Sequence, residues 1–310
     1  MPAMPIKYLS FPLIAISIWA INTIVSKLSA GVIDPGVISL DRWLLASLVM
    51  TPFMAPKVWR NKHIVIDHLP KVIVFSFLGM VLFQSLAYYA AASTSATNMG
   101  LIGSLMPLNT ILFSTLLLKE RPTLLLVVGA TLSMLGILVL VTKGQPQHLL
   151  SQGIALGDGL MLIGTIAYGA YSVLLRKWAV PLPPWQMLYL QIIFAVVMLL
   201  PVYWLSPASP ITAENLPLIL FAGIFSSIVA GFFWMQGVAH LGANRAMLFM
   251  NLLPVLVTLI AVGVLNEALH SFHLIGGLVT LSGVLLVELP KLRRTERNTP
   301  QSKASLNKPA

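Results

Sequence analysis

Long apolar runs alternate with short clusters of charged residues along most of this chain. No Asp, Glu, Lys or Arg occurs in the ranges 72–118, 178–213 and 246–266. A helix needs about 20 apolar residues to cross the hydrocarbon core of a bilayer, so the first two ranges can each hold two helices and the third can hold one. Membrane β-strands would alternate between polar and apolar residues, and these runs do not. The pattern therefore predicts an all-α integral membrane protein.

The same pattern predicts ten transmembrane helices. The least obvious break falls in AAASTSATN at 90–98, whose small and hydroxyl residues suit a tight turn at the membrane surface. The expected spans are 8–28, 38–56, 71–90, 97–118, 123–142, 154–175, 185–205, 216–238, 245–265 and 272–290. From residue 291 the chain is polar and basic, so we expect a disordered cytoplasmic tail over 291–310.

Composition also indicates lipid as the solvent. Hydrophobic residues make up 57% of the chain and charged residues 9%, against about 25% charged residues in a typical soluble domain. The net charge of +10 does not indicate a nucleic-acid partner, because the basic residues fall in the predicted loops and the tail. Sixteen Lys and Arg residues fall on one side of the predicted membrane and three on the other. This imbalance predicts that both termini are cytoplasmic, and we expect a bacterial inner membrane.

Matching residues recur at a constant separation in the two halves of the chain. The pairs separated by 147 positions include Glu120 with Glu267, Pro107 with Pro254, Gly129 with Gly276, and Gly136 with Gly283. Earlier in each half the separation is 149, which a two-residue deletion in the later copy explains. We therefore expect two five-helix units, at 1–145 and 150–290. Because five is odd, the second unit crosses the membrane in the opposite direction, and such inverted-topology repeats are typical of transporters.

Two glutamates occupy equivalent places in the units. Glu120 and Glu267 each follow a proline, Pro107 or Pro254, by thirteen residues, where the fourth helix gives way to the fifth. A carboxylate there can accept hydrogen bonds from free N–H groups and face the positive end of the next helix dipole. We predict that both glutamates are structural caps rather than proton carriers, and that the two prolines kink their helices.

The fifth helix of each unit carries small residues on one face, at spacings of four and three. They are Gly129, Ser133 and Gly136 in the first unit and Gly276, Thr280 and Gly283 in the second. Such a face allows two helix backbones to approach closely. The sequence leaves open whether this contact lies within one chain or between two, and so leaves open a monomer or a homodimer.

Several segments together resemble a known family. They are SIWAINTIVSK at 17–27, LDRWLLAS around Arg42, the run from GSLMPLNT to LGILVL that ends the first unit, LGDGLMLIGTIAYGAYSVLLRK at 156–177, and NLLPVLVTLIAVGVLNEALHSFHLIGGLVTLSGVLLV. The chain up to about residue 290 resembles the EamA-type exporters of the drug/metabolite transporter superfamily. This resemblance implies ten helices, a central cavity and export of small metabolites, often amino acids. The chain departs from the pattern at Asn266–Ala268 and at Asp41.

Polar and aromatic side chains within the predicted spans are candidates to line a substrate path, because such residues are costly in lipid. The candidates are Trp19, Asn22, Gln84, Tyr88, Asn109, Tyr168, Tyr171, Trp234 and Asn251. Trp19 and Tyr168 are central and equivalent at the separation of 149. The alternative is that Trp and Tyr anchor span ends at the membrane interface and that Asn and Gln join neighbouring helices.

The remaining intramembrane charges lie near the predicted non-cytoplasmic ends of their spans. Lys27 and Arg42 could form a gate or ion pair there, but we favour side chains that extend to the surface. Few cations would then remain near the cavity, so a neutral or zwitterionic cargo is expected. Glu267, His270 and His273 resemble a metal-ligand cluster, but a fourth ligand is missing from the sequence around them. The chain also has no cysteine, and we expect no metal, no cofactor and no enzymatic activity.

The sequence therefore predicts a secondary transporter that exports small neutral or zwitterionic metabolites, with amino acids as the first expectation. A carrier for other small metabolites or drugs is the alternative, and a channel or lipid scramblase is less favoured. No membrane-buried carboxylate stands out as a proton carrier, which favours facilitated movement.

Overall fold

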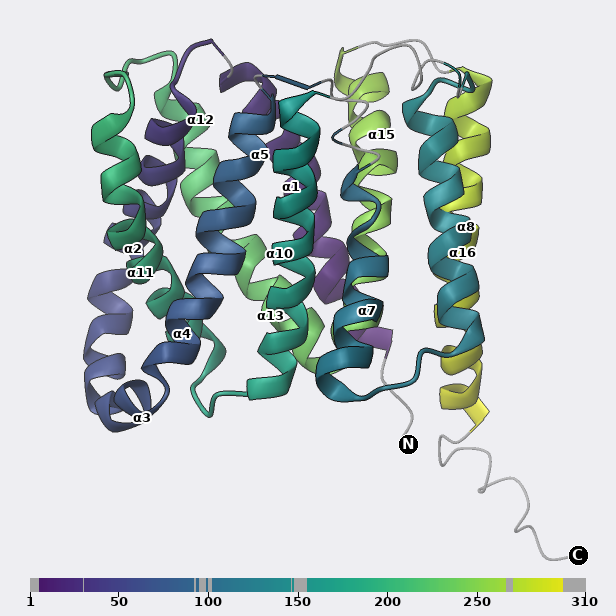
Figure 1. The fold of residues 1–310 in the computed structure, drawn as a ribbon, viewed down its shortest axis with the longest axis horizontal. Helices are drawn as coiled ribbons and strands as arrows, with labels where there is room; N and C mark the ends of the chain where they lie inside the picture. The colour runs from purple at the N-terminus through teal and green to yellow at the C-terminus, as the bar shows by residue number, and fades with distance from the viewer. Residues whose placement is uncertain are drawn as a thin grey trace, which may run out of the picture.

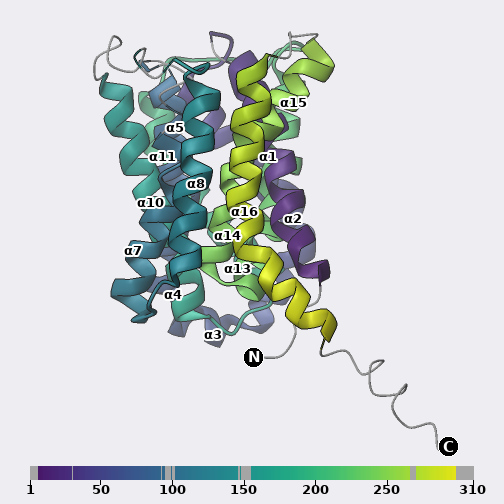
Figure 2. The same cartoon turned by 90° about the vertical axis from the view of Figure 1, so that its right-hand side faces the viewer.

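The structure is a computed structural model that describes residues 6–297 except 30, 92, 95–98, 100–101, 146, 148–154 and 266–269. Within this part of the chain, all regular structure is helical. The helices run roughly parallel to one another and cross the molecule from one side to the other (Figure 1). The described chain begins and ends on the same side of the bundle, as the perpendicular view also shows (Figure 2).

Seven helical segments of the described chain are long and apolar enough to cross a membrane by length and composition. They contain α1 (Ser10–Ser29) with the short η1 (Ile6–Leu9), α2 (Pro35–Arg60), α8 (Leu124–Val141), α10 (Leu156–Trp178), α11 (Pro184–Leu205), and two composite helices, α4–η2–α5 (69–91) and α12–η3–α13 (216–241). Shorter apolar helices are found in α7 (Met106–Leu118), in α14–η4–α15 (Ala243–Leu248, Phe249–Leu252 and Leu253–Leu265) and in α16 (Ser271–Arg297). The helix α3 (Lys62–Asp67) follows α2.

Two boundaries differ from the prediction. The expected span 97–118 becomes the regular helix α7 only at Met106, because Pro107 favours the first turn of a helix over its interior. At the other end of the chain, α16 continues to Arg297, beyond the expected end at 290. The sequence there, KLRRTER, consists mostly of residues with good helix propensity.

Two composite helices each carry a π-helical segment at an equivalent place. In the first, η2 (Ser76–Leu82) lies between α4 (Leu69–Phe75) and α5 (Phe83–Ala91). In the second, η3 (Phe221–Val229) lies between α12 (Leu216–Leu220) and α13 (Ala230–Leu241). Leu82 and Val229 are 147 positions apart, so the sequence repeat is matched by a repeated irregularity of the backbone. Such turns occur frequently at functional sites.

Helices from the two halves of the chain pack mainly against each other. The helix α1 packs on α13 and α15, and its equivalent α10 packs on α5 and α7. The helix α2 pairs with α11, where the Thr51 hydroxyl lies 3.1 Å from the Tyr189 hydroxyl. Because these contacts are reciprocal, the halves share one interior, and its largest hydrophobic cluster draws residues from both.

Many large apolar side chains face outward from the bundle. Among those more than half exposed are Leu48, Leu116, Leu124, Val197, Leu205 and Leu278. So many exposed apolar side chains are costly in water and are stable against lipid. The exterior of the bundle is therefore apolar, as in a membrane protein.

The small-residue faces of α8 and α16 pack against each other within the chain. The Ser133 hydroxyl donates to the Thr280 carbonyl at 2.9 Å, and the Thr280 hydroxyl donates to the Gly276 carbonyl at 2.8 Å. A Cβ atom placed on Gly136 would lie 2.6 Å from the Gly276 carbonyl oxygen, and one on Gly129 would lie 2.7 Å from the Gly283 carbonyl oxygen. Gly129 thus meets Gly283 while Gly136 meets Gly276, so these two equivalent helices run antiparallel.

We predict that Gly136→Val opens the contact between α8 and α16. The added side chain cannot fit against the Gly276 backbone, and we expect a loss of about 2 kcal/mol or more in the free energy of unfolding. Thermal unfolding of the purified protein in detergent checks this. The matched control is Gly159→Ala on α10, where a Cβ atom meets no described atom within 4 Å. Equal unfolding temperatures for the two variants would contradict the close approach.

Candidate functional site

A buried arginine lies at the centre of the described interior. Arg42 is 1% exposed, seven residues inside α2, which is about 10 Å along a helix that rises 1.5 Å per residue. The expectation that its side chain extends to the surface is therefore wrong. Burial is possible because neighbouring helices supply hydrogen-bond acceptors, and these replace the water that a surface arginine would have.

The guanidinium group of Arg42 is bound by four polar side chains. Its Nε donates to the Ser227 hydroxyl at 3.0 Å and its Nη2 to the Ser226 hydroxyl at 3.3 Å. Its Nη1 donates to Gln84 Oε1 at 3.0 Å and to the Tyr88 hydroxyl at 3.4 Å. The guanidinium carbon also lies 4.8 Å from the centre of the Trp43 ring, within the range of a cation–π contact. All four acceptors are neutral.

A glycine brings the two serines close to Arg42. A Cβ atom on Gly223 would lie 2.7 Å from Leu45 Cδ2 and 3.0 Å from the Arg42 carbonyl oxygen, so only glycine allows η3 to lie this near α2. The Ser227 hydroxyl donates its proton to the Ala222 carbonyl, five residues earlier, at 2.7 Å. Its oxygen is thus left to accept from Arg42, and the π-helical turn of η3 orients it.

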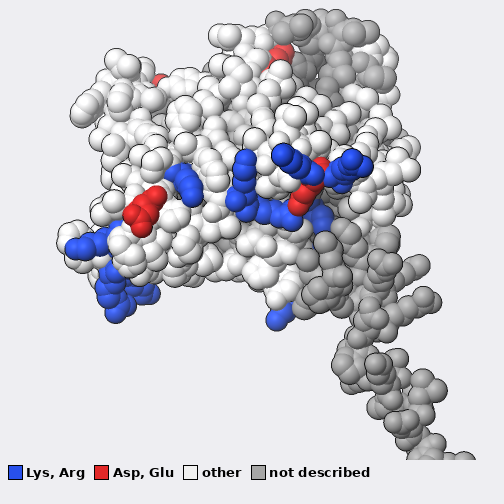
Figure 3. Space-filling model, turned by 60° about the horizontal axis from the view of Figure 1, so that its bottom comes forward, with Lys and Arg blue, Asp and Glu red and all other residues white. Residues whose placement is uncertain are grey.

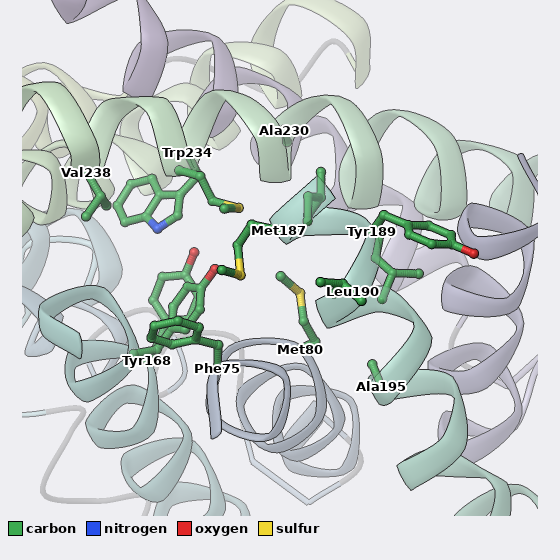
Figure 4. Packing of buried hydrophobic residues seen from close by; sticks show 14 of the residues in the cluster. Phe75, Met80, Tyr168, Met187, Tyr189, Leu190, Ala195, Ala230, Trp234 and Val238 are labelled. Carbon is green, nitrogen blue, oxygen red and sulfur yellow. The ribbon is translucent and has the colours of Figure 1, made fainter. Parts of the chain in front are cut away.

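Three aromatic rings form a wall beside the guanidinium group. This aromatic wall consists of Trp19, Tyr168 and Trp234, whose ring centres lie between 5.4 and 6.3 Å apart. The Trp19 indole N–H donates to the Ser226 carbonyl at 3.2 Å, which ties the wall to the serines that bind Arg42. In Figure 4, Trp234 and Tyr168 face each other from different helices, and the Trp234 indole nitrogen points into the space between them.

The aromatic wall and the Arg42 group enclose a narrow cavity. Its volume is about 20 Å³. The lining residues come from both halves of the chain and are Trp19, Arg42, Trp43, Gly79, Met80, Gln84, Tyr168, Tyr171, Ser226, Ser227, Gly231 and Trp234. Ligand pockets usually measure about 300–1,000 Å³, so an amino acid would enter this cavity only after side chains move apart.

Two polar donors on the cavity wall have no hydrogen-bond partner among the described residues. They are the indole N–H groups of Trp43 and Trp234, whose side chains are 2% and 1% exposed. Buried donors are normally satisfied, and leaving one unpaired costs about 1–3 kcal/mol. The cavity thus offers N–H groups that an acceptor atom could satisfy.

The structure brings together most of the predicted site residues. Trp19, Gln84, Tyr168, Tyr171 and Trp234 line the cavity, and Tyr88 touches it through Arg42. Tyr171 donates from its hydroxyl to Gln191 Oε1 at 3.1 Å. The sequence interpretation missed Trp43, Ser226 and Ser227, which have no distinctive spacing. The arginine inside an apolar span was itself a usable signal, because such charges usually face the protein interior.

Three predicted asparagines do not line this cavity. They are Asn22, Asn109 and Asn251, which lie on α1, α7 and η4. Each has at least one buried amide atom without a hydrogen-bond partner among the described residues. Asn251 is 1% exposed, so its amide is enclosed by protein rather than by lipid.

Glu120, predicted to be a helix cap, has a different role in the structure. Glu120 does not cap α8: the Thr123 hydroxyl does so, accepting from the Leu126 N–H at 3.3 Å. Glu120 instead forms an ion pair with Arg176, at 2.9 and 3.0 Å between their side-chain atoms. Each side chain is more than one-third exposed, so the pair contributes little to stability. It does, however, link the end of α7 to the end of α10.

The two prolines stand at the second positions of α7 and α15. Pro107 begins a helix rather than bending one, so the predicted kink is wrong at that residue. Pro254 follows the 3-10 segment η4, where the α-helical pattern is interrupted. Glu267 and the side chain of Lys27 lie outside the described residues. Among the residues that are described, acidic and histidine side chains do not gather in a group of three that could hold a metal ion.

Comparison with known proteins gives consistent matches over nearly the whole chain. The EamA-like transporter family matches twice, over residues 6–142 and 155–289. The uncharacterized transporter YyaM of Bacillus subtilis (strain 168) is 26% identical over 282 residues, which cover 88% of this chain and 92% of YyaM. A probable terminal-alkyne amino-acid exporter of Streptantibioticus cattleyicolor is 23% identical over 92% of this chain and 97% of its own length.

A solved crystal structure is similar in fold. It matches with a TM-score of 0.75 over 93% of this chain and 98% of that chain, at 19% sequence identity. This likeness concerns the arrangement of helices alone.

We predict that Trp234→Phe and Trp234→Ala separate the two roles of this side chain. The Phe variant keeps most of the ring and loses an N–H group that has no described partner, so its free energy of unfolding should change by less than about 1 kcal/mol. The Ala variant leaves a large void in the aromatic wall and should lose about 3–5 kcal/mol. Thermal unfolding in detergent distinguishes them, and equal losses would mean that the N–H group is already satisfied in the unliganded protein.

Proposed function

This chain belongs to the EamA-like transporter family, and from that premise we propose that it exports small zwitterionic metabolites, amino acids first among them, by alternating access. The family assignment makes it an integral membrane transporter of small molecules. One observation supports the proposal most directly. Side chains from both halves of the chain surround a narrow cavity that combines an aromatic wall with a buried cation. A zwitterion with an apolar side chain offers matching groups.

We propose a topology of ten spans in two inverted five-helix units, at 1–145 and 150–290. The seven long helical segments and the three shorter apolar ones supply enough helices. The family match in two separate segments and the paired π-helical segments support the repeat. The antiparallel contact of α8 with α16 supports the inversion, because equivalent helices of inverted units run in opposite directions.

The orientation is proposed from charge. Lys and Arg side chains gather on the side of the bundle where the described chain begins and ends, with few Asp and Glu among them (Figure 3). The connections α2–α3, α7–α8 and α10–α11 lie on this side (Figure 1) and contribute Lys57, Arg60, Lys62, Lys119, Arg121, Arg176 and Lys177. By the positive-inside rule we propose that this basic face is cytoplasmic, and we propose the inner membrane of a bacterium as the location.

Alternating access requires the two units to separate on one side at a time. The narrow cavity corresponds to an occluded or nearly occluded conformation. On the basic face, the ion pair between Glu120 and Arg176 joins α7 of the first unit to α10 of the second. It is exposed, so breaking it costs little, as a contact that opens in each cycle requires.

The proposed class of cargo is supported by the residues that line the cavity and by one distant relative. A protein that is named a probable terminal-alkyne amino-acid exporter aligns over nearly its full length. The alternative is a carrier for other small metabolites or drugs, because an aromatic wall also accepts apolar molecules without charges. We place no proton carrier in the cavity and propose facilitated movement.

We expect cells that overproduce the protein to tolerate toxic amino-acid analogues by exporting them. Intracellular analogue concentrations should fall relative to cells with an empty vector, because the carrier moves the analogue down its gradient. Proteoliposomes then measure flux directly. Saturable flux that a second amino acid inhibits is the expected result. Flux that rises in proportion to concentration would indicate a channel or scramblase, and unchanged analogue levels across a broad panel would overturn the amino-acid assignment.

A further inference from the structure

The charge of Arg42 has no carboxylate partner among the described residues. Its four hydrogen-bond acceptors are the neutral groups of Gln84, Tyr88, Ser226 and Ser227. The ion pair between Glu120 and Arg176 lies at the ends of α7 and α10 and does not involve Arg42. Asp41 directly precedes Arg42 in the sequence, but adjacent residues of a helix point about 100° apart, and it forms no ion pair with Arg42. A buried cation that lacks a counter-ion is costly and strongly attracts an anion.

The cavity around Arg42 offers more donors than acceptors. A guanidinium group has five N–H bonds and no acceptor, and it stays charged at every physiological pH. The unpartnered indole N–H groups of Trp43 and Trp234 add two further donors on the same wall. The serine, glutamine and tyrosine oxygens nearby already accept from Arg42. The group that best completes this cavity is therefore an acceptor with a negative charge.

Only the first of the two repeated units has a buried cation at this position. At the separation of 149 positions, the residue of α11 that corresponds to Arg42 is Gln191, which is fully buried and neutral. Gln191 accepts from the Tyr171 hydroxyl, and its Nε2 lies 3.8 Å from Met235 Sδ. Tyr88, which accepts from Arg42, corresponds to Met235 at the separation of 147. If Arg42 and Gln191 shared one structural role, a charged group would not be needed in one unit and a neutral amide in the other. The charge of Arg42 therefore serves a role that the second unit does not share.

We infer that Arg42 binds the carboxylate of the transported molecule, while the aromatic wall contacts the apolar remainder of that molecule. This inference rests on the proposed export function and assigns the residue that selects its cargo. A carboxylate would take the place of Gln84 and Tyr88 on Nη1, exchanging neutral acceptors for a charged one. Charge-assisted hydrogen bonds are about twice as strong as neutral ones. A single cation matches a monoanionic group and does not match a phosphate ester, which would need further positive charge.

The test compares molecules that differ only in the carboxylate. Phenylalanine and leucine are titrated onto the purified protein in detergent beside their carboxamides, with 3-phenylpropionate and 3-phenylpropionamide as a pair without the ammonium group. Tryptophan fluorescence reports binding, because Trp19, Trp43 and Trp234 line the cavity. We expect the acid of each bound pair to bind at least about tenfold more tightly than its amide, a difference typical of one charged hydrogen-bonded contact.

Variants then locate the source of that preference. In Arg42→Gln the acid should bind about as weakly as the amide, and Arg42→Lys should recover part of the preference. The matched control is Arg60→Gln, at the exposed end of the same helix, which should keep the wild-type ratio. Asp41→Asn should keep it as well. An unchanged acid-to-amide ratio in folded Arg42→Gln would overturn the inference. If that variant does not fold, the ratio measured for the wild-type protein decides alone.

The outcomes also separate this inference from the export proposal. Equal binding of acid and amide by the wild-type protein, together with saturable flux in proteoliposomes, would remove Arg42 as the carboxylate anchor and leave export standing. Saturable export restricted to molecules without a carboxylate would also overturn the role of Arg42 and leave the export proposal standing. Absence of saturable flux for every class of molecule would overturn export, and the anchor with it.

Discussion

Burial of one charged side chain among neutral partners is the constraint on which the interior of this protein depends. Arg42 needs acceptors from more than one neighbouring helix, and it receives them from α5 and η3. Gly223 must therefore lack a side chain, and the π-helical turn of η3 must orient Ser227. Because α2 and α5 belong to the first half and η3 to the second, satisfying this one charge also joins the two halves.

The contact between α8 and α16 complements this arrangement at the edge of the bundle. There the helices approach closely through glycines and a serine–threonine pair. Lipid does not drive helices together as water does, so close packing of backbones has to supply the attraction. The contact between α8 and α16 is thus tightly packed and holds the two halves together, whereas the region around the cavity can change shape. A transporter needs both properties, because a cavity that opens must move against something that stays closed.

Much of the fold follows from the sequence, because apolar length is a strong signal in a lipid-solvated chain. The all-helical architecture, the approximate location of the apolar helices and the small-residue face through which α8 packs on α16 could all be predicted. Helix ends were harder to predict: α7 begins at Met106, nine residues after the expected boundary at 97, and α16 continues to Arg297. Glu120 was assigned to a cap that Thr123 makes, because the spacing shows where a carboxylate lies in sequence but not which partner it meets across the bundle.

The candidate site was predictable in part for a related reason. Hydrophobicity that continues all around a helix hides which face turns inward, so Trp19, Tyr168 and Trp234 could be suspected while Ser226 and Ser227 could not. Arg42 was expected at the surface because long basic side chains often reach it. Its place inside an apolar span was a signal for the opposite, and the packing of η3 against α2 shows that its side chain is buried.

Access to the cavity from each side of the membrane is the most direct test of the whole account. The chain contains no cysteine, so Met80→Cys, on the cavity wall, can be labelled with a membrane-impermeant thiol reagent in right-side-out and inverted vesicles. Labelling from both sides, slowed by transported substrate, is the predicted result; labelling from one side only would contradict alternating access.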